Sequence, residues 1–248
     1  MKSFLAKICS WCPWCIFERA CPHLFRSTFF KKLKKICPFC RAYERERKQR
    51  VEENHAVYEK RMKCYKEQGL AVEKVNEFII HCAGNFSEPI LDVGTGRGYF
   101  AVALARTGVN LTTIDISKEQ QLTAKLNADY FTVLNNIRFL IRKAHYSGFK
   151  KNSFNTIFCV NAVHHFGKPY MVIDELVSLL KVNGKMILAD MDENGLRIID
   201  RIHATEGKKH KKAGVTINDI EKYLTDMPGI ILSRNEEHNE IVLTIEKK

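Results

Sequence analysis

Short apolar runs alternate with longer amphipathic segments between residues 90 and 191. Apolar runs of 4–8 residues predict buried strands, and longer segments with apolar positions three and four apart predict helices. The expected strands are ILDVG, LTTIDI, IRFLIR, TIFCVN and KMILADM, and the expected helices are YFAVALART, KEQQLTAKLNADYFTVL and YMVIDELVSLLK. This alternation predicts an α/β fold with a mostly parallel sheet and helices on both of its faces.

The two ends of the chain follow different patterns. Residues 42–67 contain no Gly or Pro and mix charges of both signs, which predicts a long solvent-exposed helix. Gly69 interrupts this helix, and a second, more apolar helix follows in LAVEKVNEFIIHCA. At the other end, IILSR and EIVLTIE flank NEEHN, so we expect the sheet to finish in an antiparallel hairpin.

Charge and cysteines concentrate in the first quarter of the chain. Residues 1–68 carry 17 Lys/Arg and 7 Asp/Glu, a net charge of +10, whereas residues 69–248 carry 23 and 21, a net of +2. Six of the nine cysteines lie within residues 1–41. We therefore predict a basic cysteine-rich module over 1–41, a helical linker over 42–68 and a globular domain over 69–248.

The sequence carries no signal for a membrane-spanning helix or for secretion. No apolar run reaches the ~18 residues that a membrane-spanning helix needs. The first residues, MKSFLAKICSWCPWC, lack a sustained apolar stretch followed by a small-residue cleavage site. These features predict a cytoplasmic protein without a transmembrane segment.

A glycine-rich loop follows the first strand of the predicted sheet. Asp92 ends the strand, and Gly94, Gly96 and Gly98 stand at every second position after it. The dinucleotide fingerprint G-x-G-x-x-G needs a third glycine where Tyr99 stands. The Gly-Lys-Ser/Thr sequence of the nucleoside triphosphate loop is absent as well. The loop is therefore of a different nucleotide-binding type.

Four segments in order resemble class I S-adenosylmethionine-dependent methyltransferases, and the resemblance covers roughly residues 70–248. The first is LDVGTGRGYFAVALA, and the second is TTIDIS, with Asp115 at the end of the next strand. FNTIFCVNAVHHF and LLKVNGKMILAD resemble the branch that includes quinone-biosynthesis and small-molecule methyltransferases. The resemblance implies a Rossmann-like fold, S-adenosylmethionine as cofactor and transfer of its methyl group to an acceptor.

The resemblance also implies a set of cofactor-binding residues. Asp92 would orient the glycine loop or the amino group of the cofactor, Asp115 would accept the ribose hydroxyls, and the glycines would let the backbone approach the methionine end. Where the branch usually has an acid near the adenine, this chain has Lys143, Ala144 and His145. The full expected set is Asp92, Gly94, Gly96, Gly98, Asp115, Ile116, Ala144, His145 and Asn161.

The histidine pair after the fourth strand has two interpretations. His164 and His165 are candidates for proton transfer during methyl transfer, because imidazole titrates near neutral pH. In the resembled family this position belongs largely to the wall of the cofactor pocket, which gives the pair a structural role instead. Asp190 and Asp192 follow the fifth strand and either face the substrate or lie solvated in a loop.

The N-terminal cysteines are candidate metal ligands. CPWC at 12–15 and CPFC at 37–40 have the same Cys-Pro-aromatic-Cys form, which predicts zinc bound by Cys12, Cys15, Cys37 and Cys40. An alternative set, Cys9, Cys12, Cys15 and Cys21, approximates an iron–sulfur spacing, although five residues stand in its final gap where the pattern has three. The third alternative is a set of reduced thiols without metal.

Three functions remain open from the sequence. The branch resemblance favours a small-molecule methyltransferase with an unidentified acceptor. The basic cysteine-rich module, with its aromatic HLFRSTFFKKLKK segment, favours an RNA or protein methyltransferase and a nucleic-acid partner. The N/D-P-P-Y/F motif of base-amino methylation is absent, since the chain reads NAVH. A non-catalytic adaptor that binds cofactor or metal is the third, and the sequence predicts no oligomeric state.

Overall fold

The structure of the protein is a computed structural model that describes residues 38–205, 207 and 214–248. The chain divides into two compact units, Met1–Asn54 and His55–Lys248. Helix α4 (Pro38–Glu67) contributes residues 38–54 to the first unit and residues 55–67 to the second. The predictions for Cys9, Cys12, Cys15, Cys21 and Cys37 lie outside the described residues.

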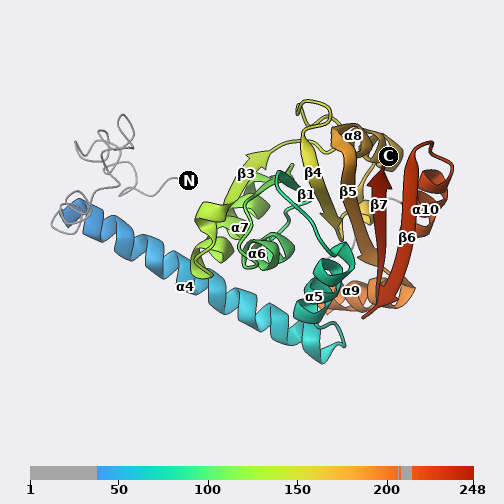
Figure 1. Cartoon of the computed structure of the whole chain (residues 1–248). Coiled ribbons are helices and arrows are strands. Elements are labelled where there is room, and N and C mark those ends of the chain that lie inside the picture. The colour runs from blue at the N-terminus through green and yellow to red at the C-terminus, as the bar shows by residue number, and fades with distance from the viewer. Residues whose placement is uncertain (1–37, 206, 208–213) are drawn as a thin grey trace. The chain divides into compact units, whose positions relative to one another are not determined.

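The second unit is built on a seven-stranded sheet in the order β3-β2-β1-β4-β5-β7-β6 (Figure 1). The strands are β1 (Ile90–Val93), β2 (Leu111–Asp115), β3 (Ile137–Ile141), β4 (Phe154–Val160), β5 (Leu180–Met191), β6 (Ile230–Glu237) and β7 (Glu240–Lys247). The first five run parallel, while β7 pairs antiparallel with both β5 and β6. This confirms the predicted fold class, including the C-terminal hairpin.

Helices cover both faces of the sheet, as expected for a parallel sheet whose strands are buried on both sides. One hydrophobic cluster joins one face to α5 (Val72–Ala83), α6 (Tyr99–Ala105), α7 (Lys118–Tyr130) and α9 (Glu193–Thr205). A second cluster joins the other face to α8 (Pro169–Leu179) and α10 (Ile217–Thr225). Alternate residues of β7 pack into the two clusters: Val242 belongs to the first cluster and Leu243 to the second. Short 3₁₀ turns precede β3 (Leu134–Asn136) and α8 (Val163–His165).

The hairpin turn fixes where β7 begins. His238 and Asn239 both have positive φ, 55° and 63°, which is the geometry of a two-residue hairpin loop. The pairing then sets Glu240 opposite Met191, the last residue of β5. Because β5 is parallel to β1 and β4, the first residue of β7 lies at the edge where those parallel strands end.

Three expectations about elements were wrong in detail. The helix expected to reach residue 134 ends at Tyr130, because Thr132 adopts a left-handed φ of 60° that turns the chain toward β3. The fifth strand starts at Leu180, where the end of a helix was expected, since its first residues continue beside β4 across an irregularity in the pairing. Helix α9 was not predicted, although four buried residues, Gly195, Ile198, Ile199 and Ile202, stand at helical spacing.

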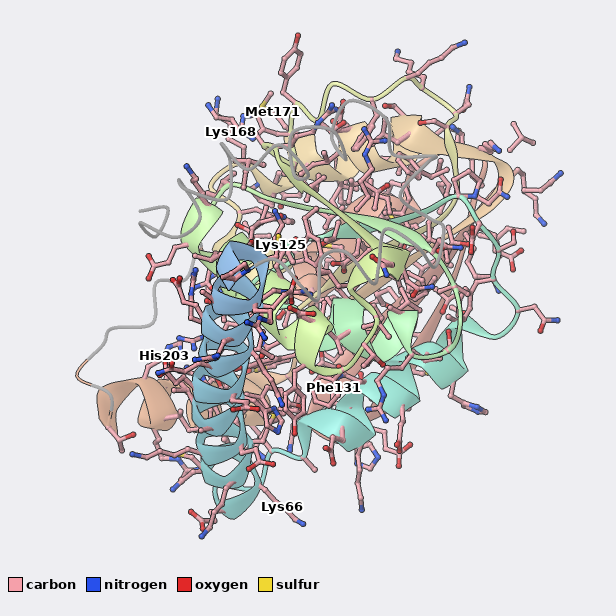
Figure 2. All side chains as sticks on the ribbon, turned by 90° about the vertical axis from the view of Figure 1, so that its left-hand side faces the viewer. Lys66, Lys125, Phe131, Lys168, Met171 and His203 are labelled. Carbon is pink, nitrogen blue, oxygen red and sulfur yellow. The ribbon has the colours of Figure 1, made fainter. Side chains whose placement is uncertain are left out.

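The end of α4 is less exposed than the sequence predicts. Tyr65 is only 7% exposed and belongs to the same hydrophobic cluster as Val75 and Ile79 of α5. His55 stacks on Tyr130 with ring centroids 3.3 Å apart, and Tyr58 meets Phe131 edge to face; Phe131 is labelled in Figure 2. The mixed charges of residues 55–67 therefore lie beside aromatic side chains that are largely half-buried. The boundary at residue 69 stays a prediction.

Two further observations concern the described residues alone. No helix among them is long and apolar enough to cross a membrane. Among the described cysteines outside the N-terminal pairs, Cys159 is fully buried, while Cys64 and Cys82 are half-buried.

Candidate active site

The glycine loop between β1 and α6 lies at the carboxyl end of the sheet, and its glycines have different functions. A Cβ on Gly94 would lie 2.7 Å from the Cβ of Ala162, and one on Gly98 would lie 2.7 Å from the Cβ of Ala124. Gly94 and Gly98 are thus required for close packing against the segment after β4 and against α7. Gly96 differs, because its φ is +50° and a Cβ there would meet nothing nearer than 3.9 Å. Open space at Gly96 leaves room for a ligand.

The buried carboxyl of Asp92 is connected to this loop by hydrogen bonds. It is 2% exposed, and its Oδ2 accepts a hydrogen bond of 2.5 Å from Thr113 Oγ1. Thr113 Oγ1 is in turn 2.5 Å from Thr95 Oγ1 in the loop, and Thr95 accepts another bond from Gln121 Nε2. Burial raises the pKa of Asp92 from 3.8 to about 7, and the nearby Asp115 adds to the shift, while the Thr113 bond opposes it. The carboxyl of Asp92 therefore orients the loop through two threonines.

Asp115, at the end of β2, is held in place by two backbone groups. The N–H of Gly96 donates to its Oδ2 and the N–H of Ser117 donates to its Oδ1, both over 2.8 Å. A carboxylate has about four lone-pair positions, so both oxygens can still accept from a ligand. Asp115 is half-buried and its side chain faces a cavity. The position matches the one that the sequence predicts for a ribose-binding acid.

The larger cavity, of about 480 Å³, brings together most of the predicted cofactor residues. Gly94, Gly96, Asp115, Ile116, Ala144, His145 and Asn161 all line it. Asp92 and Gly98 are not among the residues that line it. His165, Phe166 and Lys168 add the segment that leads into α8, and Lys168 lies with the half-exposed Met171 at the start of this helix (Figure 2).

A smaller cavity, of about 200 Å³, lies on the other side of the loop. It shares Gly94, Gly96 and Asn161 with the larger cavity. Its other walls come from the end of α4, α5, α6, α9 and the ends of β5 and β7. The side chain of Asn161 lies at the junction, and its Oδ1 is buried without a hydrogen-bond partner among the described residues.

Glu240 is the acidic residue of the smaller cavity. It is 1% exposed, and neither of its carboxyl oxygens has a hydrogen-bond partner in the part of the chain that the structure describes. Burial raises the pKa of Glu240 well above its ordinary value, and the nearby Asp190 and Asp192 add to the shift. The Asn161 side chain acts in the opposite direction, but it makes no hydrogen bond of normal geometry with either oxygen.

The two histidines after β4 have different environments. His164 is buried, its Nδ1 lies 2.5 Å from Asp190 Oδ1, and its backbone N–H donates to Asp190 Oδ2 over 3.0 Å. His164 lines neither cavity, whereas the exposed His165 lines the larger one. Asp190 is engaged with His164 and with the N–H of Met191, so it is not a solvated loop residue.

Sequence reasoning found the larger cavity and missed the smaller one. Glu240, Asn76 and Tyr65 line the smaller cavity and were not among the candidates. A signal for Glu240 was present, because an acid opens an otherwise apolar strand, EIVLTI, whose first six residues are all buried. Asn76 and Tyr65 carry no comparable signal, since each stands in an ordinary helical pattern.

Comparison with known proteins identifies the domain. Residues 91–188 match the family described as Methyltransferase domain. A ubiquinone biosynthesis O-methyltransferase of Photobacterium profundum is 26% identical over 122 residues, which are 49% of this chain and 51% of that protein. The corresponding protein of Erwinia tasmaniensis is 28% identical over 159 residues, 63% of each chain. The match thus covers about half the length of the first of these relatives.

Solved structures share the fold at low sequence identity. A SAM-dependent methyltransferase from Aquifex aeolicus aligns with a TM-score of 0.53 and 18% identity, over 73% of this chain and 92% of that one. The magnesium protoporphyrin IX methyltransferase of Synechocystis, solved with bound SAH, aligns with a TM-score of 0.55 and 18% identity, over 79% and 96%. The [4+2]-cyclase SpnF aligns with 0.54 and 16%, over 71% and 82%. At these identities the likeness concerns the fold alone.

The fold, the loop and the family match together define a class of protein. The parallel sheet with a final antiparallel hairpin, and the Asp92–Gly98 loop facing Asp115, belong to the nucleotide-binding α/β proteins. Within that class, residues 91–188 match the methyltransferase domain family, and the domain shares its fold with S-adenosylmethionine-dependent methyltransferases.

Proposed function

We propose that this protein is an S-adenosylmethionine-dependent methyltransferase that acts on a small molecule. The observation that carries the proposal is the Asp115 carboxylate, held by the N–H groups of Gly96 and Ser117 at the mouth of the 480 Å³ cavity. The family match over residues 91–188 supports the methyl-transfer chemistry. The relatives named as ubiquinone biosynthesis O-methyltransferases support a small hydroxyl-bearing acceptor.

The residues of the larger cavity fit the cofactor. Asp115 would hold the ribose hydroxyls, and Ile116 and Ala144 would flank the adenine. The open space at Gly96 would admit the methionine end. Asn161 offers a buried Oδ1 that lacks a partner among the described residues, as expected of a side chain whose partner is a ligand. His145 lines the cavity near Ala144 and would supply a polar contact that the resembled branch usually makes with an acid.

The chain's own contribution to the reaction is positional. When bound, the cofactor supplies an activated methyl group, so the protein has to align an acceptor behind that methyl and exclude water. Holding two reactants in line is worth roughly 7–11 kcal/mol of the barrier. The Asp92–Thr113–Thr95 network fixes the loop, and Asp115 fixes the ribose, which together set the cofactor's position. His165 is the histidine that could contact a ligand, because it lines the larger cavity.

The experiment that tests this function is calorimetry with S-adenosylmethionine and S-adenosylhomocysteine. Binding of both by the folded protein is expected. A folded protein that gives no heat with either compound would contradict the proposal. Incubation with labelled S-adenosylmethionine and fractionated cell extract then identifies the acceptor class. Label in the small-molecule fraction is expected, and label confined to RNA or protein would favour the alternative acceptors.

The cysteine-rich N-terminus supports a separate proposal that rests on the sequence. Cys12, Cys15, Cys37 and Cys40 form two C-x2-C pairs whose 21-residue gap is just longer than the ~15–20 usual for paired zinc knuckles, and the net charge of +10 over residues 1–68 suits a polyanionic partner. Cys40 is the member of this set that the structure describes, and it is buried. Among the described residues no cluster of metal-binding side chains is present.

Elemental analysis of anaerobically purified protein tests the metal. One equivalent of zinc that is lost in the C37S/C40S double variant is expected. Iron with acid-labile sulfide, retained in that variant and lost in C9S/C21S, would favour the iron–sulfur alternative. Metal-free protein would contradict both.

A further inference from the structure

The smaller cavity combines apolar walls with one buried acid. Leu70, Val72, Val75, Phe100, Met191 and Ile199 supply most of the walls. Polar groups come from Glu240, Asn161, Asn76, Thr95 and the cationic Arg97. Neither Glu240 oxygen nor Asn161 Oδ1 has a hydrogen-bond partner among the described residues. An apolar pocket with a few convergent polar groups is the usual composition of a small-molecule site.

The position of Glu240 has no structural explanation within the described fold. Buried polar groups in proteins are nearly always hydrogen-bonded, because leaving one without a partner is costly. The next five residues of β7, Ile241 to Ile245, are also buried, and four of them are aliphatic. An aliphatic residue at position 240 would continue that pattern and bury no carboxyl group. The described residues supply no hydrogen-bond partner for a carboxyl at this position, which leaves both of its oxygens free for a ligand.

We infer that the smaller cavity is the methyl-acceptor site, and that Glu240 binds the acceptor through an O–H or N–H group that donates to its carboxyl. This inference rests on the proposed methyltransferase function. The cavity is continuous in its lining with the cofactor cavity, since Gly94, Gly96 and Asn161 belong to both. An acceptor bound at Glu240 would therefore lie across the glycine loop from the nucleoside end of the cofactor.

The cavity also restricts the chemistry of the acceptor. About 200 Å³ is below the ~300–1,000 Å³ usual for ligand pockets, so the site takes a small molecule or one end of a larger one. Aliphatic and aromatic walls favour an apolar skeleton. Asp190 and Asp192 act on Glu240 through their charges, which disfavours a carboxylate on the part of the acceptor that meets Glu240, while Arg97 is the cationic residue in the lining of the cavity. The acceptor class is thus a small, largely apolar alcohol, phenol or amine.

The test uses three single-ring probes: catechol with hydroxyl donors, benzylamine with an amine donor, and anisole with neither. Each is titrated into protein saturated with S-adenosylhomocysteine. Catechol or benzylamine is expected to bind at least ten-fold more tightly than anisole, and the tighter of the two tells a hydroxyl acceptor from an amine acceptor. Equal binding of all three, or no binding of any, would overturn the inference.

Two variants assign the preference to Glu240. E240L replaces a buried carboxyl without a partner by an apolar side chain of similar size, which proteins tolerate well, so the variant is expected to fold. It should lose the donor preference and keep its affinity for S-adenosylhomocysteine. E246L, at the other end of β7, is the control and should keep both. A preference that survives in E240L overturns the inference.

The cofactor titration separates this inference from the proposed function. If E240L binds S-adenosylhomocysteine ten-fold more weakly than the wild type, Glu240 holds the cofactor itself and the acceptor assignment is wrong. If the wild-type protein binds S-adenosylhomocysteine but shows no donor preference, the acceptor site fails and the methyltransferase proposal stands. If the wild type does not bind S-adenosylhomocysteine, both fail.

Discussion

The backbone N–H of Gly96 donates a hydrogen bond of 2.8 Å to Oδ2 of Asp115, which joins the glycine loop to the end of the neighbouring strand. The two residues are 19 positions apart in the sequence, and β1 and β2 are paired in parallel. One carboxylate thus holds the loop and faces the cavity at the same time. The loop geometry and the ligand contact depend on the same side chain.

D115A is expected to weaken S-adenosylhomocysteine binding at least ten-fold. The change removes the ribose contact and the two backbone hydrogen bonds that Asp115 accepts, and a hydrogen bond to a charged group is worth roughly 1.5–3 kcal/mol. Calorimetry measures the affinity. D115N keeps an oxygen for one of the two N–H groups and should bind with intermediate affinity. Unchanged binding by D115A would exclude Asp115 from the cofactor site.

D92N is expected to stabilise the protein, and increasingly so as the pH rises. The carboxyl of Asp92 titrates at about 7 in the folded chain against an ordinary value of 3.8. Between these two values the unfolded chain is ionised while the folded one holds the proton, so the wild type loses stability as the pH rises. The loss is complete above about pH 7. Asn can still accept the Thr113 bond, so the loop should persist.

Urea unfolding at pH 5 and pH 8 measures this effect. The stability advantage of D92N over the wild type should grow by roughly 2–3 kcal/mol between these pH values, at about 1.4 kcal/mol per pKa unit. D226N, at an exposed acid, is the matched control and should show no such trend. An advantage that is independent of pH would mean that Asp92 is ionised in the folded protein throughout this range.

Alanine at three glycines should separate packing from ligand binding. G94A is expected to lower the free energy of unfolding by roughly 2–4 kcal/mol, from a positive φ and the contact with Ala162. G96A introduces only the strain of a positive φ, so it should lower the free energy of unfolding by roughly 1–2 kcal/mol. It should weaken S-adenosylhomocysteine binding at least ten-fold, because the added methyl group fills space that the ligand needs. G108A, with positive φ and nothing within 4 Å, is the control and should bind normally. Equal affinities in G96A and G108A would contradict a ligand at Gly96.

Substitutions of His164 and His165 should differ in their effect on the free energy of unfolding. H164A leaves Asp190 buried without its imidazole partner and should lower the free energy of unfolding by roughly 2–4 kcal/mol. H165A, at an exposed position, should change it by less than about 1 kcal/mol. Thermal and urea unfolding measure both. If adding D190N to H164A does not restore part of the lost stability, the unpaired Asp190 is not the cause of the destabilisation.

Truncation tests the domain boundary. A chain that begins at His55 keeps Tyr58 and Tyr65 against the core, whereas one that begins at Gly69, the boundary the sequence predicts, loses both. Removing a buried aromatic side chain costs roughly 3–5 kcal/mol, so the longer chain should be clearly more stable. Circular dichroism melting curves and S-adenosylhomocysteine binding compare the two. Equal stability and affinity would place the boundary at 69.

The sequence alone determined the elements and one half of the site. Apolar runs and helical spacing are local signals, so they located β1 to β4, the hairpin and most of the helices. The loop residues Asp92 to Gly98 and the acid Asp115 were also visible, because they lie at or just after the carboxyl end of a strand in a parallel sheet. Such residues meet at the same edge whatever the packing details are.

The tertiary structure decided the other half. Glu240 lines a cavity with Asn161, 79 positions away, only because β7 inserts beside β5 and begins where β5 ends. Asp190 pairs with His164 instead of lying in a solvated loop, because the segment after β4 lies beside the end of β5. Tyr65 is buried because the end of α4 packs against elements distant in sequence. Burial and the identity of a polar partner are set by elements distant in sequence, and local periodicity carries no information about them.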